Sequence, residues 1–162
     1  MDIKSIPNHE LERLKQKAQE LSGSKTDFHT EYSSLLARRL NNEPLQYIEE
    51  FMPFYTVQLS VDERALIPRP ETEYLIEVIK NKVKDPKSIL DVGTGSGCIS
   101  IMLKSLYQNA NVTGIDISPN AIELAKENAI LNNLDVNFIE SDLLENVPEN
   151  NFDLIVANLP YI

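Results

Sequence analysis

The chain has 162 residues, of which 42% are hydrophobic and 25% charged, and its 25 Asp and Glu against 15 Lys and Arg give a formal charge of −10. This composition disfavours disordered and fibrous classes, and the length accommodates one domain, or a small module ahead of part of another. The acidic balance lacks the basic face that a phosphate backbone requires, so direct nucleic acid binding is not expected.

The sequence shows no membrane, export or metal signal. No apolar run approaches the roughly 20 residues that span a bilayer, and charges and Pro7 interrupt the start of the chain where a signal peptide would be apolar. We therefore expect a cytoplasmic location and no membrane association. A single cysteine, Cys98, excludes an internal disulfide and a cysteine-based metal cage. His9 and His29 belong to no motif and are expected at the surface.

Helical periodicity dominates up to about Asn42. Apolar residues recur at spacings of three and four over 11–21 and again over 32–40, as one face of a helix requires. Gly23 lies where a glycine commonly follows the end of a helix. The heptad pattern is not sustained, so a small packed helical domain over residues 1–50 is expected rather than a coiled coil.

The period changes to two over residues 54–61, which predicts a strand or one arm of a hairpin. Pro68 and Pro70 then force an extended entry into a helix that can begin at the second proline and is expected over 70–84. Residues 51–69 are therefore predicted to form a hairpin and a linker.

Strands and helices alternate in the rest of the chain. The predicted strands cover 88–92, 111–115, 136–139 and 154–157, and the predicted helices 96–107 and 119–132. Strands separated by helices of this length indicate βαβ units and a mainly parallel sheet, with helices expected on both faces. The strands, numbered along the chain, are expected to lie in the order 3-2-1-4. The predicted fold class is therefore α/β, a Rossmann-like sheet preceded by a small all-α domain and a hairpin.

A glycine-rich turn follows the first of these strands. Residues 89–97 read Ile-Leu-Asp-Val-Gly-Thr-Gly-Ser-Gly, and glycines in such a turn let a ligand approach the backbone closely. The third glycine comes one position early for the dinucleotide motif G-x-G-x-x-G, and the Lys-Ser/Thr of a P-loop is missing. A ligand without a pyrophosphate fits better, and the alternative is a tight turn that serves packing only. Cys98, at the start of the helix, is expected to pack against the sheet.

Carboxylates stand near the ends of three strands. Asp116 lies at the offset from the glycines at which an acidic side chain accepts hydrogen bonds from a ribose diol. Asp142 could accept the exocyclic amine of an adenine, with Leu143 or Leu144 against the ring, or it could be an ordinary loop aspartate. Asp91 could bind a ligand ammonium group or order the glycine turn through hydrogen bonds.

The segment Asn158-Leu159-Pro160-Tyr161 comes directly after the fourth strand. In the expected strand order it faces the glycine turn across the crevice at the carboxyl ends of the strands, where open sheets bind ligands. Asn158 offers an acceptor oxygen and two N–H donors, Pro160 stiffens the turn, and Tyr161 supplies a flat wall with a hydroxyl. The ligand of the glycine turn would thus be presented to Asn158.

From about Arg38 to its last residue the chain resembles the N-terminal part of the HemK/PrmC family of protein glutamine methyltransferases. These enzymes use S-adenosyl-L-methionine to modify peptide chain release factors at a conserved glutamine. The stretches that carry the resemblance are Glu43-Pro44-Leu45-Gln46-Tyr47-Ile48, Leu66-Ile67-Pro68-Arg69-Pro70-Glu71-Thr72-Glu73, Asp91-Val92-Gly93-Thr94-Gly95-Ser96-Gly97-Cys98-Ile99, Asp116-Ile117-Ser118-Pro119 and 152–162. The glycine motif is shared by many methyltransferases, whereas Pro-Arg-Pro-Glu-Thr-Glu is close to diagnostic.

The resemblance implies that residues 70–162 are the first half of a class I methyltransferase domain and that residues 1–50 recognise the substrate. It also implies where the cofactor S-adenosyl-L-methionine and the substrate glutamine, in a GGQ motif, are bound. The predicted cofactor-binding residues are Asp91, Gly93, Thr94, Gly95, Ser96, Gly97, Asp116, Asp142, Leu143 and Asn158. The predicted catalytic residues are Asn158, Leu159, Pro160 and Tyr161, and no metal is predicted.

Two departures from the family leave alternatives open. Leu159 replaces the usual proline, a form that resembles the rRNA adenine dimethyltransferases, but the backbone carbonyl that the site needs as an acceptor is retained. The chain also stops where the family's fourth strand ends, so it is expected to be a fragment, a truncated product, or dependent on association. The alternative functions are an adenine-amine methyltransferase acting on RNA or DNA and a non-catalytic partner-binding module. Arg69 is either a pocket residue near the cofactor or a surface ion-pair partner.

Overall fold

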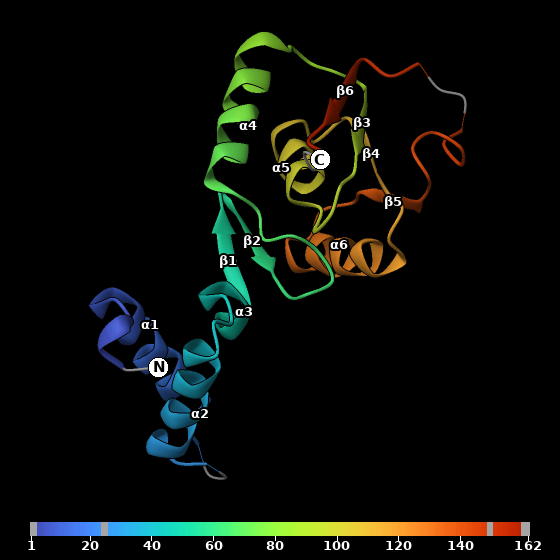
Figure 1. Cartoon of the computed structure of the whole chain (residues 1–162). Helices are drawn as coiled ribbons and strands as arrows, with labels where there is room; N and C mark the ends of the chain where they lie inside the picture. Colours follow the sequence, from blue (N-terminus) through green and yellow to red (C-terminus); the bar gives the residue numbers. More distant parts are fainter. Residues whose placement is uncertain (1–2, 24–25, 149–150, 160–162) are drawn as a thin grey trace. The chain divides into compact units, whose positions relative to one another are not determined.

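The computed structural model describes residues 3–23, 26–148 and 151–159, and Figure 1 shows its helices and strands in chain order. The chain separates into two units, Met1–Glu50 and Phe51–Ile162. The described elements of the first unit are helices, and those of the second form a hairpin and a parallel sheet with helices. No helix in these described ranges is long and apolar enough to cross a membrane.

The first unit is a small helical bundle, as its periodicity predicts. Its elements are the 3-10 helix η1 (Ile3–Ser5) and the α-helices α1 (Asn8–Leu21), α2 (Phe28–Leu40) and α3 (Leu45–Glu49). Their shared core consists of Leu14, Ala18, Leu35, Leu45 and Ile48. Asp27 caps α2 by accepting a hydrogen bond from the N–H of Thr30 at 3.1 Å. Helix α1 ends at Leu21 and its C-cap residue Ser22 is extended, so Gly23 follows the helix without acting as a left-handed cap.

Ion pairs tie these helices together. Arg39 donates to Glu10 at 2.6 Å and so joins α1 to α2, and Arg13 donates to Glu49 at 2.7 Å and so joins α1 to α3. The hydrogen bond from Arg39 holds the pKa of Glu10 below its usual value. These arginines are thus neutralised by internal partners rather than presented together as a basic patch.

The second unit contains a four-stranded parallel sheet. Its strands are β3 (Ser88–Val92), β4 (Asn111–Asp116), β5 (Asn137–Glu140) and β6 (Leu154–Ala157), in the order β5-β4-β3-β6. This order is the predicted one, and it confirms the α/β class. The register pairs Val92 with Ile115 on one side and with Ala157 on the other. The carboxyl ends of the strands, where the predicted site residues follow, therefore lie along one edge of the sheet.

The helices of this unit cover one face of the sheet, so the expectation of helices on both faces is wrong for the described chain. They are α4 (Pro70–Lys82), α5 (Cys98–Leu106) and α6 (Pro119–Leu131), with α5 in contact with the other two. The crossovers β3–α5–β4 and β4–α6–β5 step in the same direction along the sheet, and right-handed crossovers of that kind place their helices on the same face. The connection from β5 to β6 steps back, and its described residues, 141–148 and 151–153, lie on the side of the sheet away from α4 and α5 (Figure 1). Its Val147 and Phe152 pack there against Leu90 and Ile115.

Local sequence explains where these helices begin. Pro70 occupies the first turn of α4, and Ser118 caps α6 by accepting from the N–H of Ala121 at 3.3 Å. The next helix, α5, begins at Cys98 and not at Ser96 as predicted, because Gly97 before it is in the left-handed conformation with φ of 81°.

The predicted strand over 54–61 is a hairpin within the second unit. Strands β1 (Phe51–Phe54) and β2 (Val57–Ser60) pair antiparallel, and Tyr55 in the turn between them has a φ of 53°. The predicted alternation holds from Val57 onward, since Val57 and Leu59 are buried and Gln58 is exposed. Residues 54–56 are the end of a strand and a turn, because the N–H of Tyr55 turns away to donate to Glu73 of α4 at 3.0 Å.

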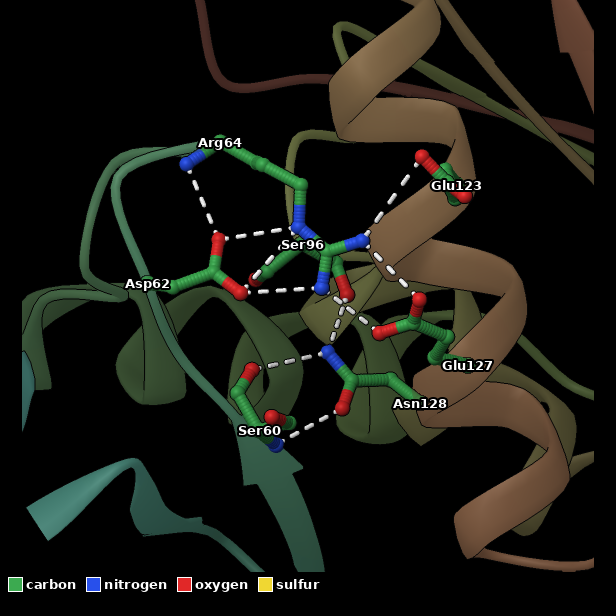
Figure 2. Close-up of polar contacts among 7 residues, drawn as sticks. All are labelled: Ser60, Asp62, Arg64, Ser96, Glu123, Glu127 and Asn128. Atoms are coloured by element: carbon green, nitrogen blue, oxygen red, sulfur yellow. Dashed lines mark hydrogen bonds and ion pairs between the residues drawn. The ribbon is translucent and has the colours of Figure 1, made fainter.

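Asn128 of α6 and Asn132, the C-cap residue of the same helix, bind the backbone of β2 as a neighbouring strand would. Asn132 accepts from the N–H of Gln58 at 3.1 Å and donates to its carbonyl at 2.6 Å. Asn128 does the same with Ser60, at 2.7 and 3.0 Å (Figure 2). The match is geometric, since four residues along a helix and two along a strand both rise about 6 to 7 Å. Asn128 is fully buried and also donates to the carbonyl of Ser96 in the glycine turn at 3.0 Å.

Candidate functional site

A cavity of about 1130 Å³ opens at the carboxyl ends of the strands. Its wall is formed by the segment that leads into α4, one side of α4, the glycine turn, and the residues at and after the ends of β4, β5 and β6. The predicted site residues on this wall are Gly93, Thr94, Gly95, Ser96, Asp116, Asp142, Leu143, Asn158 and Leu159. Asp91 and Gly97 do not line it, and Pro160 and Tyr161 lie outside the described residues.

The glycine turn is bent against the end of β4. The N–H of Thr94 donates to the carbonyl of Ile115 at 2.8 Å, and the N–H of Gly95 donates to Oδ2 of Asp116 at 2.9 Å. At Gly95 the φ is 56° and a β-carbon would meet no atom within 4 Å, so the backbone is open to a ligand. At Gly97 a β-carbon would instead lie 3.1 Å from the side chains of Ala125 and Ile101. The close packing and the left-handed φ of 81° both favour glycine at this position, and a role of Gly97 in binding a cofactor stays a prediction.

Asp91 is buried beneath the cavity wall and holds the glycine turn through hydrogen bonds. Its Oδ2 accepts hydrogen bonds from the hydroxyls of Thr94 and Ser100, each at 2.7 Å, and from the N–H of Ser100 at 3.2 Å. Its Oδ1 is buried and has no partner among the described atoms. Burial raises the pKa of this carboxyl. These contacts fit the second of the two predicted roles, ordering of the loop, and a direct role in binding a cofactor stays a prediction.

Gly114 of β4 lets Ser100, one of the partners of Asp91, pack closely against the sheet. The sequence does not reveal this contact. A β-carbon there would lie 2.6 Å from Oγ of Ser100 and 2.7 Å from the Phe138 ring. Gly114→Ala is expected to lower the free energy of unfolding by about 1 to 3 kcal/mol through overpacking, measured by urea denaturation. Gly23→Ala, where a β-carbon meets nothing within 4 Å, is the control and should be neutral. Equal stability of both variants would contradict the packing argument.

Acceptors and apolar surface meet beyond β4 and β5. Asp116 is half-buried, and its carboxylate accepts from the N–H of Gly95 and, at 3.0 Å, from the N–H of Ser118. A carboxylate has about four acceptor positions, so two stay available for a ligand. The helix-capping role that could have explained Asp116 is filled by Ser118.

An apolar pair lines the same part of the wall. Leu143 is 59% exposed and Ile117 is 65% exposed, and both lie on the cavity beside the carboxylates. The sequence analysis missed Ile117, although an apolar residue directly after a strand-end carboxylate was the available signal. This part of the cavity can hold a flat ring between apolar side chains, with Asp142 within the same wall as an exposed acceptor.

The segment after β6 closes on the glycine turn, as the strand order predicts. Leu159 Cδ2 lies 2.6 Å from the position that a β-carbon of Gly93 would occupy. Asn158 Nδ2 donates to Oγ1 of Thr72, in the first turn of α4, at 3.3 Å. Thr72 is a buried residue of the cavity wall that sequence analysis did not assign to the site, because its contact with Asn158 joins segments far apart in the chain.

Of the remaining residues that the sequence analysis considered, Arg69 lies at the cavity and the two histidines do not. Arg69 lines the cavity and makes no ion pair within the described part of the chain, which decides between its two predicted places in favour of the pocket. Cys98 is buried, and burial raises the pKa of its thiol to about 12, so it is not a thiolate at neutral pH. His9 and His29 both lie in the helical unit and are exposed, as expected.

Comparison with known proteins shows that the chain is similar to methyltransferases. A family model described as methyltransferase small domain matches residues 70–162. Release factor glutamine methyltransferase of Lactococcus lactis is 47% identical over 139 residues, 85% of this chain and 51% of the relative, and the protein of that name from Flavobacterium psychrophilum is 42% identical over 82% and 48%. A solved structure, Pyrococcus abyssi tRNA (uracil-54, C5)-methyltransferase in complex with S-adenosyl-L-homocysteine, superposes with a TM-score of 0.55 at 26% identity, over 65% of this chain and 27% of that one. The chain spans about half the length of the curated relatives it matches.

Proposed function

We propose, because this chain belongs to the methyltransferase small domain family, that it provides the cofactor-binding part of an S-adenosyl-L-methionine-dependent methyltransferase. The methyl acceptor in this proposal is the side-chain amide of a glutamine, in a GGQ motif, of a peptide chain release factor. The names of the curated relatives support that substrate. A release factor as partner also favours a cytoplasmic location.

The cavity fits an S-adenosyl ligand. Asp116 offers free acceptor positions for a ribose diol, Asp142 can accept an adenine amine, and Ile117 and Leu143 supply apolar contacts for the ring. The open backbone at Gly95 lets the ligand approach the turn. A volume of about 1130 Å³ slightly exceeds that of an ordinary small-molecule site, roughly 300 to 1000 Å³. Space therefore remains for the side chain that receives the methyl group.

The observation that carries the proposal is the position of Asn158. Its Nδ2 is held by Thr72, so its Oδ1 stays available to accept a hydrogen bond from a substrate amide. The carbonyl of Leu159 next to it is a second acceptor, and the contact of Leu159 with the glycine turn holds that residue beside the cofactor cavity.

Positioning is the chemistry that these residues supply. The amide nitrogen of glutamine is a poor nucleophile because its lone pair is delocalised into the carbonyl. Two acceptors on its two N–H groups fix the nitrogen and favour the pyramidal geometry that attack requires. The bound cofactor contributes a methyl group on a positively charged sulfur, which is a good electrophile. The leaving group would be the neutral thioether S-adenosyl-L-homocysteine. The methylated nitrogen is strongly acidic while it carries the positive charge, so its extra proton passes to water and no general base on the protein is required.

Label transfer tests the function directly. The protein, tritiated S-adenosyl-L-methionine and a purified release factor are incubated together, and radioactivity is counted in the separated release factor. Asn158→Ala should reduce the rate of labelling about a hundredfold, the effect of losing one preorganised hydrogen-bonding group in an active site, with little change in cofactor affinity. Asn81→Ala, on the exposed surface of α4 and away from the cavity, is the matched control.

Other outcomes distinguish the alternatives. When RNA is added to the same mixture, label in RNA but not in protein would favour an adenine-amine methyltransferase. The exocyclic amine of adenine needs the same two acceptors, and the Asn158-Leu159 sequence resembles the rRNA adenine dimethyltransferases. Cofactor binding without label in either would indicate a partner-binding module. The formal charge of −10 argues against the nucleic acid substrate, and no nucleic acid binding is part of this proposal.

A further inference from the structure

Two arginines, Arg64 and Arg69, are the basic residues on the described wall of the cavity. All three guanidinium nitrogens of Arg64 are engaged (Figure 2). They donate to Asp62 at 2.8 Å and to both carboxylate oxygens of Glu127 at 2.6 and 2.9 Å, and Glu123 lies 3.8 Å away. These carboxylates raise the pKa of Arg64 and neutralise its charge. The residue fastens the loop after β2 to α6 and is not available to a ligand.

Arg69 has the opposite environment. Its side chain is exposed and makes no ion pair within the described residues, although it lies on the cavity wall. Arg69 lies between Pro68 and Pro70 and is the N-cap residue of α4, with an extended backbone. Its carbonyl accepts a hydrogen bond from the N–H of Thr72 at 2.9 Å. The positive end of the α4 dipole reinforces its charge. The cavity thus contains one uncompensated cation in its described wall.

The charged groups of the cavity are arranged along the sheet edge. Asp116 ends β4 and Asp142 follows β5 at one end, and the uncharged Asn158 follows β6 at the other, joined to α4 through Thr72. Three inter-strand spacings of about 4.8 Å separate β5 from β6. An S-adenosyl ligand whose adenosine binds the two aspartates would therefore extend its amino-acid end toward α4.

We propose that Arg69 binds the carboxylate at the amino-acid end of the S-adenosyl cofactor. The inference rests on the proposed cofactor and adds which group of the ligand fixes its orientation in the cavity. Glu71 lines the same wall two residues further along the chain, and its carboxylate is the group that would take the adjacent ammonium group. A guanidinium suits this role because its planar fork matches a carboxylate in two parallel hydrogen bonds.

A pair of ligands that differ by one group tests the proposal. Calorimetry measures the affinity of the full chain for S-adenosyl-L-homocysteine and for its decarboxylated analogue, 5′-deoxy-5′-(3-aminopropylthio)adenosine. Arg69→Met should weaken binding of the first about tenfold to a hundredfold, as expected for a charge-assisted hydrogen bond, and leave the second within about twofold. Arg69→Lys should recover part of the loss, since it keeps the charge without the fork.

The controls separate this inference from the function on which it rests. Lys126→Met removes one positive charge from the exposed surface of α6, away from the cavity, and should change neither affinity. Retained binding of the decarboxylated analogue by Arg69→Met shows that the variant is folded. Equal weakening of both ligands, or no weakening of either, would overturn the assignment of Arg69 while leaving the cofactor in place. Wild-type protein that binds neither ligand would overturn the cofactor proposal itself and the inference with it.

Discussion

Replacing Asn128 by leucine is expected to lower the free energy of unfolding by about 3 to 5 kcal/mol, because several polar backbone groups lose their partner at once. The fully buried carboxamide bonds the N–H and the carbonyl of Ser60 and the carbonyl of Ser96. Leucine has a similar volume, so the loss reports the hydrogen bonds rather than a cavity. Urea denaturation followed by circular dichroism measures the effect.

Asn132 provides the matched control for this prediction. It makes the same paired hydrogen bonds to Gln58 from the C-cap of α6, one turn beyond Asn128, but in a solvent-exposed setting. Water can replace the side chain there, so Asn132→Leu should cost about 0.5 to 1.5 kcal/mol. Similar losses of unfolding free energy for the two variants would contradict the prediction, because they would show that burial does not make the Asn128 hydrogen bonds more important than the exposed ones.

Asp116→Ala is expected to weaken binding of S-adenosyl-L-homocysteine about tenfold to a hundredfold, which corresponds to about 1.5 to 3 kcal/mol for hydrogen bonds to a charged group. The carboxylate loses its acceptor positions for the ribose, and the N–H of Gly95 loses the partner that holds the glycine turn. Calorimetry measures the affinity, and a thermal melt with and without ligand checks that the fold is intact.

Two further variants test whether the loss of affinity comes from the carboxylate of Asp116 at this position. Asp116→Asn keeps the shape and one acceptor oxygen, so its loss of affinity should be smaller than that of the alanine variant. Asp135→Ala removes the same charge from an exposed loop outside the cavity and should bind normally. An affinity of Asp116→Ala equal to wild type would remove Asp116 from the ligand site.

The strand order and the ends of the strands could be predicted from sequence because their signals are local. The alternation of apolar strands with helices of ordinary length predicts a parallel sheet, and the glycines and Asp116 mark where two strands end. The handedness of the crossovers would have placed α5 and α6 on one face, since the predicted strand order steps in the same direction twice. The single helical face of this part of the sheet is therefore predictable from the strand order.

The side-chain partners that build the site depend on contacts between distant segments and could not be predicted. Thr72 reads as one residue of a helical turn until its contact with Asn158 is known, and Asn128 reads as a polar residue on an amphipathic helix. The role of Asp91 was left open for the same reason, because its choice between ligand and loop depends on Ser100, nine positions further along the chain.

The pairing of α6 with β2 also bears on how the protein behaves among other copies of itself. A hairpin of two strands has two outer edges, and each is a template on which a strand of another molecule can add. At Gln58 and Ser60 the donors and acceptors of one edge are already taken by side-chain amides. The helix thus shields this edge against intermolecular sheet growth, and it does so without adding a strand to the fold.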